Sequence, residues 1–274
     1  MNRSELFRRI QEKQSFLCVG LDPDLSRLPA HLNGNVLAFN EAIIDATRDL
    51  CVAYKPNTAF YESLGLEGMR ILKQTIDYIG GDHLVIADAK RGDIGNTSKA
   101  YARFAFETLG ADAITVAPYM GEDSVCPFLQ YDGKWGILLA LTSNKGSEDF
   151  QHATQDGTVP LYAKVMTQAS NWGSPDQLMF VCGATQAEKF RELRALAPRY
   201  FFLVPGVGAQ GGDLEAVCRY GMNDHCGLLV NSSRGILYAG GGLDFAHHAR
   251  TEARRLQERM ATALEKYLPQ TFAA

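Results

Sequence analysis

Eight short apolar segments recur along the chain at fairly even spacing. They are rich in Val, Ile, Leu and Phe, and their apolar residues follow one another instead of alternating with polar ones. Strands of a parallel sheet that is covered on both faces have this pattern. The eight predicted strands span residues 16–20, 51–54, 83–87, 113–117, 136–141, 178–182, 200–204 and 227–230.

Helical patterns lie between most of the predicted strands. Residues 245–268, for example, repeat apolar residues every three or four positions, which gives a helix one apolar face. Strands that alternate with helices over about 250 residues are typical of a closed barrel. We therefore predict an α/β fold, a (β/α)8 TIM barrel that forms a single domain over residues 1–274, with an open doubly wound sheet as the alternative. The other predicted helices span residues 1–14, 36–50, 62–79 and 184–196, and the polar segment 146–160 is long enough to be a functional loop.

Composition and charge argue against several classes of function. The chain has 274 residues and a formal net charge of −4, so no overall positive field attracts nucleic acid or a membrane surface. No run of about 18 apolar residues predicts a membrane span, and the N-terminal segment lacks the apolar core of a signal peptide. The six cysteines form no C-x-x-C pair and the histidines show no metal-ligand spacing. We expect reduced thiols, no metal and a cytoplasmic location.

Polar residues follow at least six of the predicted strands. In a (β/α)8 barrel the chemistry lies at the carboxyl ends of the strands, so these residues are the candidates for a functional site. They are Asp22 after the first strand, Lys55 and Asn57 after the second, Asp88 and Lys90 after the third, residues 142–144 after the fifth, residues 205–212 after the seventh and residues 231–234 after the eighth.

Three ionisable residues are expected to lie together at this end of the barrel. Asp88 and Lys90 are two residues apart, so in a regular strand their side chains point to the same side. Lys55 ends the neighbouring strand, and alternating charges reduce the cost of confining all three. The spacing alone leaves a structural ion-pair network open. Asp93 lies past the strand end, where it could cap the following helix or reach a neighbouring subunit.

The glycine-rich segment after the seventh predicted strand suggests a phosphate site. Gly206, Gly208 and Gly211 match G-x-G-x-x-G, but a dinucleotide site would place this motif after a first strand, with an acid about 20 residues further on. Barrels often bind phosphate with the loops after strands seven and eight, where Gln210 and Arg234 can contribute polar and charge-assisted contacts. The residues themselves thus predict a barrel enzyme for a small phosphorylated substrate and name no reaction.

Six segments of the chain resemble one family. The segment DAKRGDI resembles the D-x-K-x-x-D motif of orotidine 5′-phosphate decarboxylases. GLDPD, AYKPN, LTSNKGS, PGVGAQGGD and NSSRGI resemble the same family, in its order, across about nine-tenths of the chain. GLDPD and the long loop after the fifth strand are most similar to the longer bacterial branch of the family.

The resemblance implies decarboxylation of orotidine 5′-phosphate to UMP and CO2 without a metal or other cofactor, in a homodimer with shared active sites. Lys90 would protonate C6 of the pyrimidine, and Asp88 would lie against the departing carboxylate. Lys55 and Asp93 would complete the charged array, with Asp93 supplied by the partner subunit. The implied substrate-binding residues are Asp22 and Asn96 for the ribose, Ile94 and Thr97 for the neighbouring site, Ser143 for the pyrimidine, and Gln210, Arg234, Gly208 and Ser233 for the phosphate.

One position departs from the family pattern, and two other functions compete. Gly95 stands where the pattern often has proline, which affects the inter-subunit loop but removes no functional group. Sugar-phosphate decarboxylases and hexulose-phosphate synthases share D-x-K-x-x-D and use Mg²⁺, but Ser143 with Asn144, GLDPD and Gln210 favour a pyrimidine nucleotide. A non-catalytic nucleotide-phosphate sensor would need Gly208 and Arg234 but not Lys90.

Overall fold

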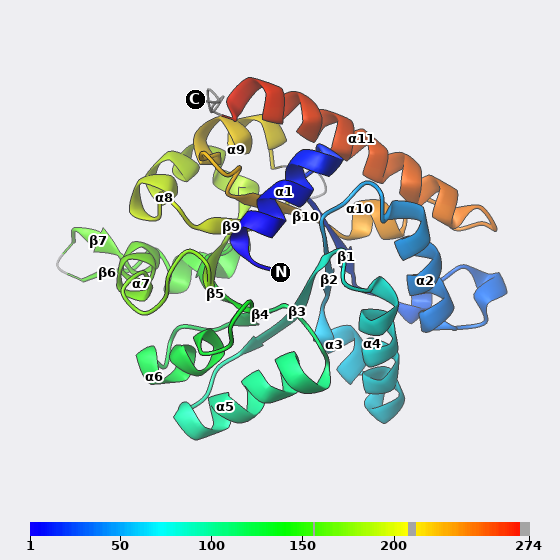
Figure 1. Cartoon of the computed structure of the whole chain (residues 1–274), viewed down its shortest axis with the longest axis horizontal. Coiled ribbons are helices and arrows are strands. Elements are labelled where there is room, and N and C mark those ends of the chain that lie inside the picture. Colours follow the sequence, from blue (N-terminus) through cyan, green and yellow to red (C-terminus); the bar gives the residue numbers. More distant parts are fainter. Residues whose placement is uncertain (156, 208–211, 269–274) are drawn as a thin grey trace.

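The computed structural model describes residues 1–155, 157–207 and 212–268. Eight parallel strands form a closed barrel in the order β1-β10-β9-β8-β5-β4-β3-β2, with helices around it (Figure 1). This confirms the predicted (β/α)8 barrel; the open sheet is wrong because β1 pairs with both β2 and β10. The barrel strands are β1 (Leu17–Leu21), β2 (Ala53–Pro56), β3 (Leu84–Arg91), β4 (Ala113–Val116), β5 (Trp135–Leu141), β8 (Leu178–Cys182), β9 (Phe201–Pro205) and β10 (Leu228–Ser232).

Helices connect the strands and cover the outside of the barrel. They are α1 (Arg3–Lys13), α2 (Val36–Thr47), α3 (Thr58–Glu62), α4 (Gly65–Ile79), α5 (Gly95–Arg103), α6 (Glu122–Val125), α7 (Leu161–Ala169), α8 (Phe190–Leu196), α9 (Leu214–Gly221), α10 (Arg234–Leu237) and α11 (Phe245–Tyr267). Short helical turns accompany them: η1 (Leu25–Arg27), η2 (Ala30–Leu32), η3 (Phe104–Thr108), η4 (Cys126–Leu129), η5 (Lys145–Asp149) and η6 (Ala184–Lys189). Within the described ranges, no helix is long and apolar enough to cross a membrane.

Each predicted strand corresponds to one barrel strand, whereas two predicted helices are divided. Residues 184–196 contain η6 followed by α8 instead of one α-helix. The segment 62–79 was expected to form a single helix, but α3 ends at Glu62 and α4 begins at Gly65. Gly65 has a φ of +69°, a left-handed value that a continuous right-handed helix does not contain. The chain therefore turns between the two helices.

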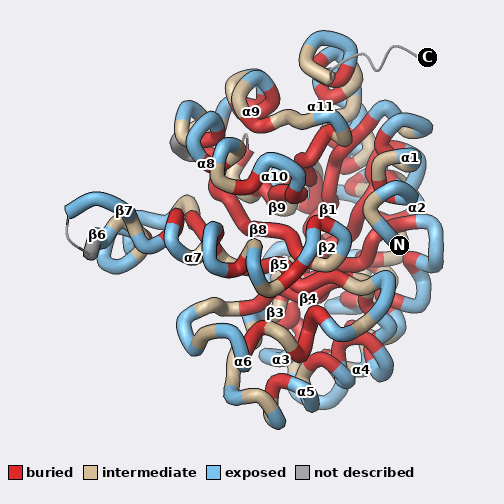
Figure 2. Tube along the Cα trace, turned by 60° about the vertical axis from the view of Figure 1, so that its left-hand side comes forward, coloured by how far each residue is buried: buried red, intermediate tan, exposed pale blue. Residues whose placement is uncertain are grey.

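The burial of the strands explains their continuous apolar sequences. Every residue of β1, β2, β4 and β8 is buried, because the barrel interior lies on one face and the helices on the other (Figure 2). Four polar residues within the strands are also buried: Lys55, Asp88, Thr115 and Asn231. Buried polar groups need hydrogen-bond partners or a function, so these four residues are candidates for the functional site.

Helix α1 covers the amino end of the barrel. Its ribbon crosses the barrel centre in Figure 1. The indole of Trp135 donates to the carbonyl of Met1 over 2.8 Å, and the Lys13 ammonium donates to the carbonyls of Arg48 and Cys51. These contacts lie at the starts of β5 and β2. The carboxyl ends of the strands consequently form the open mouth.

The polar segment 146–160 contains part of η5 and a two-stranded hairpin. Strands β6 (Thr154–Gln155) and β7 (Val159–Pro160) pair antiparallel and project away from the barrel (Figure 2). The Gln151 side chain anchors the segment, because it accepts from the Thr142 amide and donates to the Thr142 hydroxyl, each over 2.8 Å.

The six cysteines are free thiols, and all except Cys126 are buried. Burial raises the pKa of the Cys51 thiol to about 11 and that of Cys226 to about 12, which keeps both protonated at neutral pH. The prediction of reduced core thiols is confirmed for the five buried residues.

Candidate active site

Residues from the carboxyl ends of several strands line one cavity of about 220 Å³ at the barrel mouth. The lining residues are Asp22, Lys55, Asn57, Asp88, Pro205, Gly206, Val207, Asn231, Ser232, Ser233 and Arg234. The strands that carry them lie far apart in the sequence, and closure of the barrel between β1 and β10 brings them together. Five of the catalytic and substrate-binding residues that the family resemblance implies therefore share one cavity: Asp22, Lys55, Asp88, Ser233 and Arg234.

Lys55, Asp88 and Lys90 form a continuous ion-pair network. The Lys55 ammonium lies 2.8 Å from Oδ2 of Asp88, and the Lys90 ammonium lies 2.6 Å from Oδ1. The side chains of Lys55 and Asp88 are 6% and 8% exposed, whereas that of Lys90 is 48% exposed. Lys55 is thus a fixed partner within the barrel, and Lys90 is the cation that a ligand can reach.

Asp88 and Lys55 keep their charges at neutral pH. Burial acts to raise the pKa of Asp88, but the ammonium groups of Lys55 and Lys90 outweigh it and lower the pKa to about 2. Burial acts in the opposite direction on Lys55, and the Asp88 and Asp22 carboxylates outweigh it, so the pKa of Lys55 lies above its ordinary value. The site therefore presents a carboxylate beside two ammonium groups.

The contact between Asp88 and Lys90 does not arise from the regular strand alternation that predicted it. The pairing of β3 with β4 is interrupted after Ala87 and resumes only at Arg91. Lys90 has a φ of +49°, in the left-handed region. The residues that pair on either side of the interruption are Ala87 with Ile114 and Arg91 with Val116. A bulge, and not a regular pleat, therefore sets the direction of the Lys90 side chain.

Thr115 contacts this network and was not among the residues predicted from the sequence. Its hydroxyl donates to Oδ1 of Asp88 over 3.0 Å and accepts from the Lys90 amide over 2.9 Å. The available signal was a single hydroxyl within the apolar segment AITVA, next to the strand that carries Asp88. That signal is weak, because threonine is common in strands.

The part of the cavity formed after β1 and by β10 contains buried oxygen atoms without protein partners in the described chain. Oδ1 of Asp22 and Oδ1 of Asn231 are buried and accept no hydrogen bond from the described residues. The Asn231 amide donates to the Ser233 hydroxyl over 3.2 Å. A Cβ on Gly20 would lie 1.8 Å from that hydroxyl oxygen, so glycine permits the close approach of β1 to the segment after β10.

Tyr238 connects the segment after β10 with the segment after β1. Its hydroxyl donates to the carbonyl of Asp22 over 3.0 Å and accepts from the amide of Asp24 over 2.6 Å. The Arg27 guanidinium lies 3.9 Å from the centre of the Tyr238 ring. The two hydrogen bonds of the Tyr238 hydroxyl hold the backbone on both sides of Pro23, and they therefore hold the backbone position from which the Asp22 side chain extends.

The predicted phosphate residues are only partly within the described chain. Arg234 begins α10, is exposed, and lines the cavity beside Ser233. Gly206 has a φ of +94°, which requires glycine at this turn. Gly208 and Gln210 lie outside the described residues.

The residues around Asp93 lie beside the site but make no contact with its ion pairs. The Asp93 carboxylate accepts from the Ile94 amide over 2.7 Å, and its carbonyl accepts from the Ser98 hydroxyl. Helix α5 begins at Gly95, so Asn96 and Thr97 lie in its first turn and not in the loop that the sequence suggested. The N-cap residue is Ile94 and no side chain caps the helix, so the capping role considered for Asp93 is wrong.

Ser143 lies in a neighbouring cavity. This cavity of about 150 Å³ is formed by the segment after β5 and by Gly183 after β8. A Cβ on Gly183 would lie 2.7 Å from the Ser143 amide nitrogen, which shows how closely the two strand ends approach. The structure thus places Ser143 at the mouth, but it does not line the cavity that contains Asp88.

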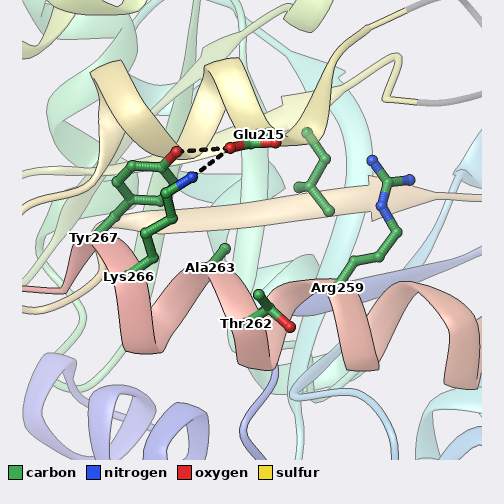
Figure 3. A pocket seen from close by; sticks show the side chains of 7 residues that line it. Glu215, Arg259, Thr262, Ala263, Lys266 and Tyr267 are labelled. Carbon is green, nitrogen blue, oxygen red and sulfur yellow. Dashed lines mark hydrogen bonds and ion pairs between the residues drawn. The ribbon is translucent and has the colours of Figure 1, made fainter.

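Two further cavities lack the predicted chemistry. An apolar cavity of about 720 Å³ lies beside the ends of β4 and β5 and includes Tyr119 and Phe150. Another, of about 280 Å³, lies between α9 and α11 (Figure 3). There Glu215 accepts from Lys266 and Tyr267, which ties the last helix to α9. Neither cavity contains a predicted site residue.

Metal ligands do not cluster in the part of the chain that the structure describes. No group of three or more His, Cys, Asp or Glu side chains there could hold a metal ion. Asp22 and Asp88 are the two carboxylates that line the mouth cavity, and Asp88 is already paired with two ammonium groups.

Fold and site together define a barrel enzyme with a charged network at the carboxyl ends of its strands. Residues 15–247 match the orotidine 5′-phosphate decarboxylase / HUMPS family, and the chain belongs to this family.

Individual relatives are similar to this protein over nearly the whole chain. A Bacteroides fragilis (strain YCH46) protein named orotidine 5′-phosphate decarboxylase is 55% identical over 274 residues, 98% of this chain and 100% of that protein. A Parabacteroides distasonis protein of the same name is 56% identical over 267 residues, 95% of each chain. The structure of Leishmania donovani OMP decarboxylase superposes with a TM-score of 0.84 at 38% identity, covering 96% of this chain and 99% of that one.

Proposed function

We propose that this protein converts orotidine 5′-phosphate to UMP and CO2 in the mouth cavity, as the decarboxylase of pyrimidine biosynthesis, without a cofactor. The observation that carries the assignment is the Lys55–Asp88–Lys90 network at the barrel mouth in a chain of this family. Neither rival function is favoured, because the relatives that match over the full chain are named for this decarboxylation.

Lys90 is the proposed proton donor. When the bond between C6 and the carboxylate carbon breaks, CO2 leaves and the electron pair remains on C6. A fixed ammonium stabilises this developing charge and then transfers one proton to C6, which leaves a neutral amine that solvent reprotonates. The half-exposed position of the Lys90 side chain suits both contacts.

Asp88 and Lys55 prepare the site for that step. With its pKa lowered to about 2, Asp88 is ionised when the substrate carboxylate lies against it, and departure of CO2 relieves the repulsion. Lys55 holds Oδ2 of Asp88 within the barrel, so the carboxylate keeps its place when Lys90 acts on substrate. The charges are arranged before substrate binds, which avoids reorganisation during the reaction.

The remainder of the substrate is proposed to contact the other side of the mouth. The unpartnered Oδ1 of Asp22 suits a ribose hydroxyl, with Asn96 as a further ribose contact, and Ser143 is proposed to contact the pyrimidine. Arg234 and the Ser233 segment are proposed to bind the phosphate together with Gln210 and Gly208. An anion next to the guanidinium of Arg234 gains a charge-assisted contact.

We further propose a homodimer in which Asp93, Ile94 and Thr97 enter the partner's site. Within the described part of this chain Asp93 makes no ion pair, and the Ile94 side chain is 55% exposed. Tyr119 and Met120, which precede α6, are 91% and 49% exposed, a large apolar surface for a single chain to leave in water. A second copy of the chain would cover this surface.

Hybrid dimers test the shared site. Chains that carry Lys90→Ala are mixed with chains that carry Asp93→Ala, after unfolding and refolding together. If Asp93 crosses the interface, each hybrid dimer contains one site with neither substitution, and about a quarter of wild-type activity returns in a statistical mixture. A mixture no more active than its two parents contradicts the crossing.

The decarboxylation itself is tested with purified protein in a chelator. Loss of orotidine 5′-phosphate absorbance should proceed at the same rate with and without chelator. Activity that disappears in chelator and returns with Mg²⁺ would instead support the sugar-phosphate branch of the family, whose enediolate chemistry uses the metal.

Two coarser expectations complete the proposal. Residues 1–274 are proposed to form one barrel domain, because α11 contacts β1, and Leu6 and Ile10 of α1 are buried in the same hydrophobic core as the barrel strands. A cytoplasmic location is proposed from the free thiols and from the role in pyrimidine biosynthesis.

A further inference from the structure

We propose that Thr115 is a positioning residue for the reacting groups: its hydroxyl holds the Asp88 carboxylate and the Lys90 backbone in place while the Lys90 ammonium acts on substrate. The inference rests on the proposed decarboxylation, and it assigns Thr115 no contact with substrate.

The backbone around the network creates a need for this hydroxyl. Between two regular pairs of β3 and β4 residues, the three residues 88–90 of β3 face only Thr115 of β4. A bulge of this kind leaves backbone groups without their usual partners on the neighbouring strand. The Lys90 amide is one such group, and it donates to the Thr115 hydroxyl over 2.9 Å.

The same hydroxyl has a second, directional contact. It donates to Oδ1 of Asp88 over 3.0 Å, and Thr115 is completely buried. A hydroxyl has one hydrogen to donate, so the contact with Asp88 uses the donor and the contact with Lys90 uses an acceptor lone pair. Both bonds therefore form together without competition.

The Lys90 backbone conformation is one that needs support. Its φ of +49° lies in the left-handed region, which a side chain with a Cβ seldom occupies. This conformation turns the Lys90 side chain back toward Asp88, where the ammonium lies 2.6 Å from Oδ1. The Thr115 hydroxyl accepts a hydrogen bond from the Lys90 amide, so it holds the Lys90 backbone in place while the side chain moves.

During the reaction, Thr115 also helps to keep the Asp88 carboxylate in its orientation. Oδ1 of Asp88 is shared between Thr115 and Lys90, and Oδ2 belongs to Lys55. When Lys90 turns to C6, the hydroxyl of Thr115 and the ammonium of Lys55 still hold one carboxylate oxygen each. The carboxylate cannot then follow the departing lysine, and its orientation toward the substrate is preserved.

Thr115→Val tests the proposal because valine has nearly the same shape and lacks the hydroxyl. We expect kcat to fall about 10- to 100-fold, because a displacement of about 1 Å or less in the position of a reacting group has an effect of this size. The dissociation constant of UMP should change less than about threefold, since the atoms that bind the nucleotide are untouched. Thr115→Ser restores the hydroxyl and should recover most of kcat.

Thr47→Val is the matched control. Thr47 is also completely buried, and its hydroxyl contacts the Ile43 carbonyl and the Tyr54 hydroxyl within α2 and β2. Its loss should lower resistance to urea by an amount similar to that of Thr115→Val and leave kcat within about twofold of wild type. This comparison separates loss of a buried hydroxyl from loss of this particular hydroxyl.

Three results would overturn the inference. The first is a folded Thr115→Val variant with kcat within twofold of wild type, and the second is loss of UMP binding in proportion to kcat. The third is a crystal structure of the variant in which Lys90 keeps its left-handed φ and Asp88 its orientation, a readout that needs no activity. Failure of the wild type to consume orotidine 5′-phosphate contradicts the proposed function instead, so the two failures are distinguishable.

Discussion

The two sides of the mouth cavity differ in how far the protein satisfies its own polar groups. On the side of β2, β3 and β4, the Asp88 carboxylate has a protein partner for each oxygen. On the side of β1 and β10, Asp22 and Asn231 each keep a buried oxygen without a partner in the described chain, and Arg234 is exposed. One side is complete before substrate arrives, and the other offers groups for a ligand to satisfy.

This difference follows from what each side is proposed to do. Groups that stabilise a developing charge act best when they are already oriented, because reorienting them would add to the barrier. Groups that bind the ribose and phosphate gain most when the ligand supplies partners that the protein lacks. Substitutions on the two sides should therefore affect kcat and affinity separately, and the following predictions test that separation.

The largest effect is expected from Lys90→Ala. Removing the ammonium removes both the charge that stabilises C6 and the proton that quenches it, so kcat should fall at least about 10³-fold. UMP affinity should stay close to wild type, as measured by calorimetry. Lys73→Ala, which removes a partly exposed lysine paired with Asp77 on α4, is the control. Near-normal turnover by the Lys90 variant would show that the proton comes from elsewhere.

Arg234→Ala should act mainly on affinity. Loss of the charge-assisted contact should weaken UMP binding about 10- to 100-fold. Binding of uridine, which has no phosphate, should not change, so the ratio of the two affinities reports on the phosphate alone. Arg255→Ala on α11, where the guanidinium lies 3.6 Å from Glu252, is the control. An equal loss for uridine and UMP would place Arg234 outside the phosphate site.

The ion pairs of Asp88 with Lys55 and Lys90 should also affect the stability of the fold in acid. The pKa of Asp88 is about 2 in the folded protein against an ordinary value of 3.8, so its charge contributes stability above about pH 4. That contribution, on the order of 2 kcal/mol, is lost as the pH falls from 4 to 2. The free energy of unfolding of Asp88→Asn should therefore approach that of wild type over this range, as measured with urea.

The exposed Asp132→Asn, in the turn before β5, is the control for that experiment. A gap between Asp88→Asn and wild type that stays constant from pH 5 to pH 2 would show that the carboxylate charge contributes no stability.

The smallest effect is expected from Tyr238→Phe. Phenylalanine keeps the ring against Arg27 and loses the hydroxyl that bridges Asp22 and Asp24. Looser placement of Asp22 should weaken UMP binding about fivefold, the value of roughly one hydrogen bond, with kcat little changed. Tyr200→Phe, whose hydroxyl donates to the Gly173 carbonyl, is the control. If kcat falls more than the affinity for UMP, Tyr238 acts with the Lys55–Asp88–Lys90 network and not with the groups that bind the ribose.

Much of the fold follows from local patterns in the sequence. Continuous apolar segments predicted each of the eight barrel strands, because a strand buried on both faces has few other compositions. The helix expected over 62–79 failed at Gly65, where a single positive φ ended the periodicity that the apolar residues suggested. Gly65 and Gly68 weakened the start of this helix in the sequence, but glycine is also tolerated within helices, so the pattern did not locate the break.

The site was less accessible to such reasoning. Lys55 and Asp88 were placed together because neighbouring parallel strands end at the same rim, and their ion pair is present. Thr115 was missed because its role comes from a bulge in the opposite strand. The first turn of α5 was mistaken for loop because backbone bonds to Ile94, and no capping side chain, begin that helix.

The sequence by itself determined the barrel, the end of it that carries polar groups, and the charges available there, because these depend on composition and periodicity along single segments. Only the tertiary structure decided how those groups act together. The bulge opposite Thr115, the left-handed Lys90 and the approach of Gly20 to Ser233 all depend on contacts between strands distant in sequence. Such contacts are set by the register and close packing of the whole barrel, which no local pattern encodes.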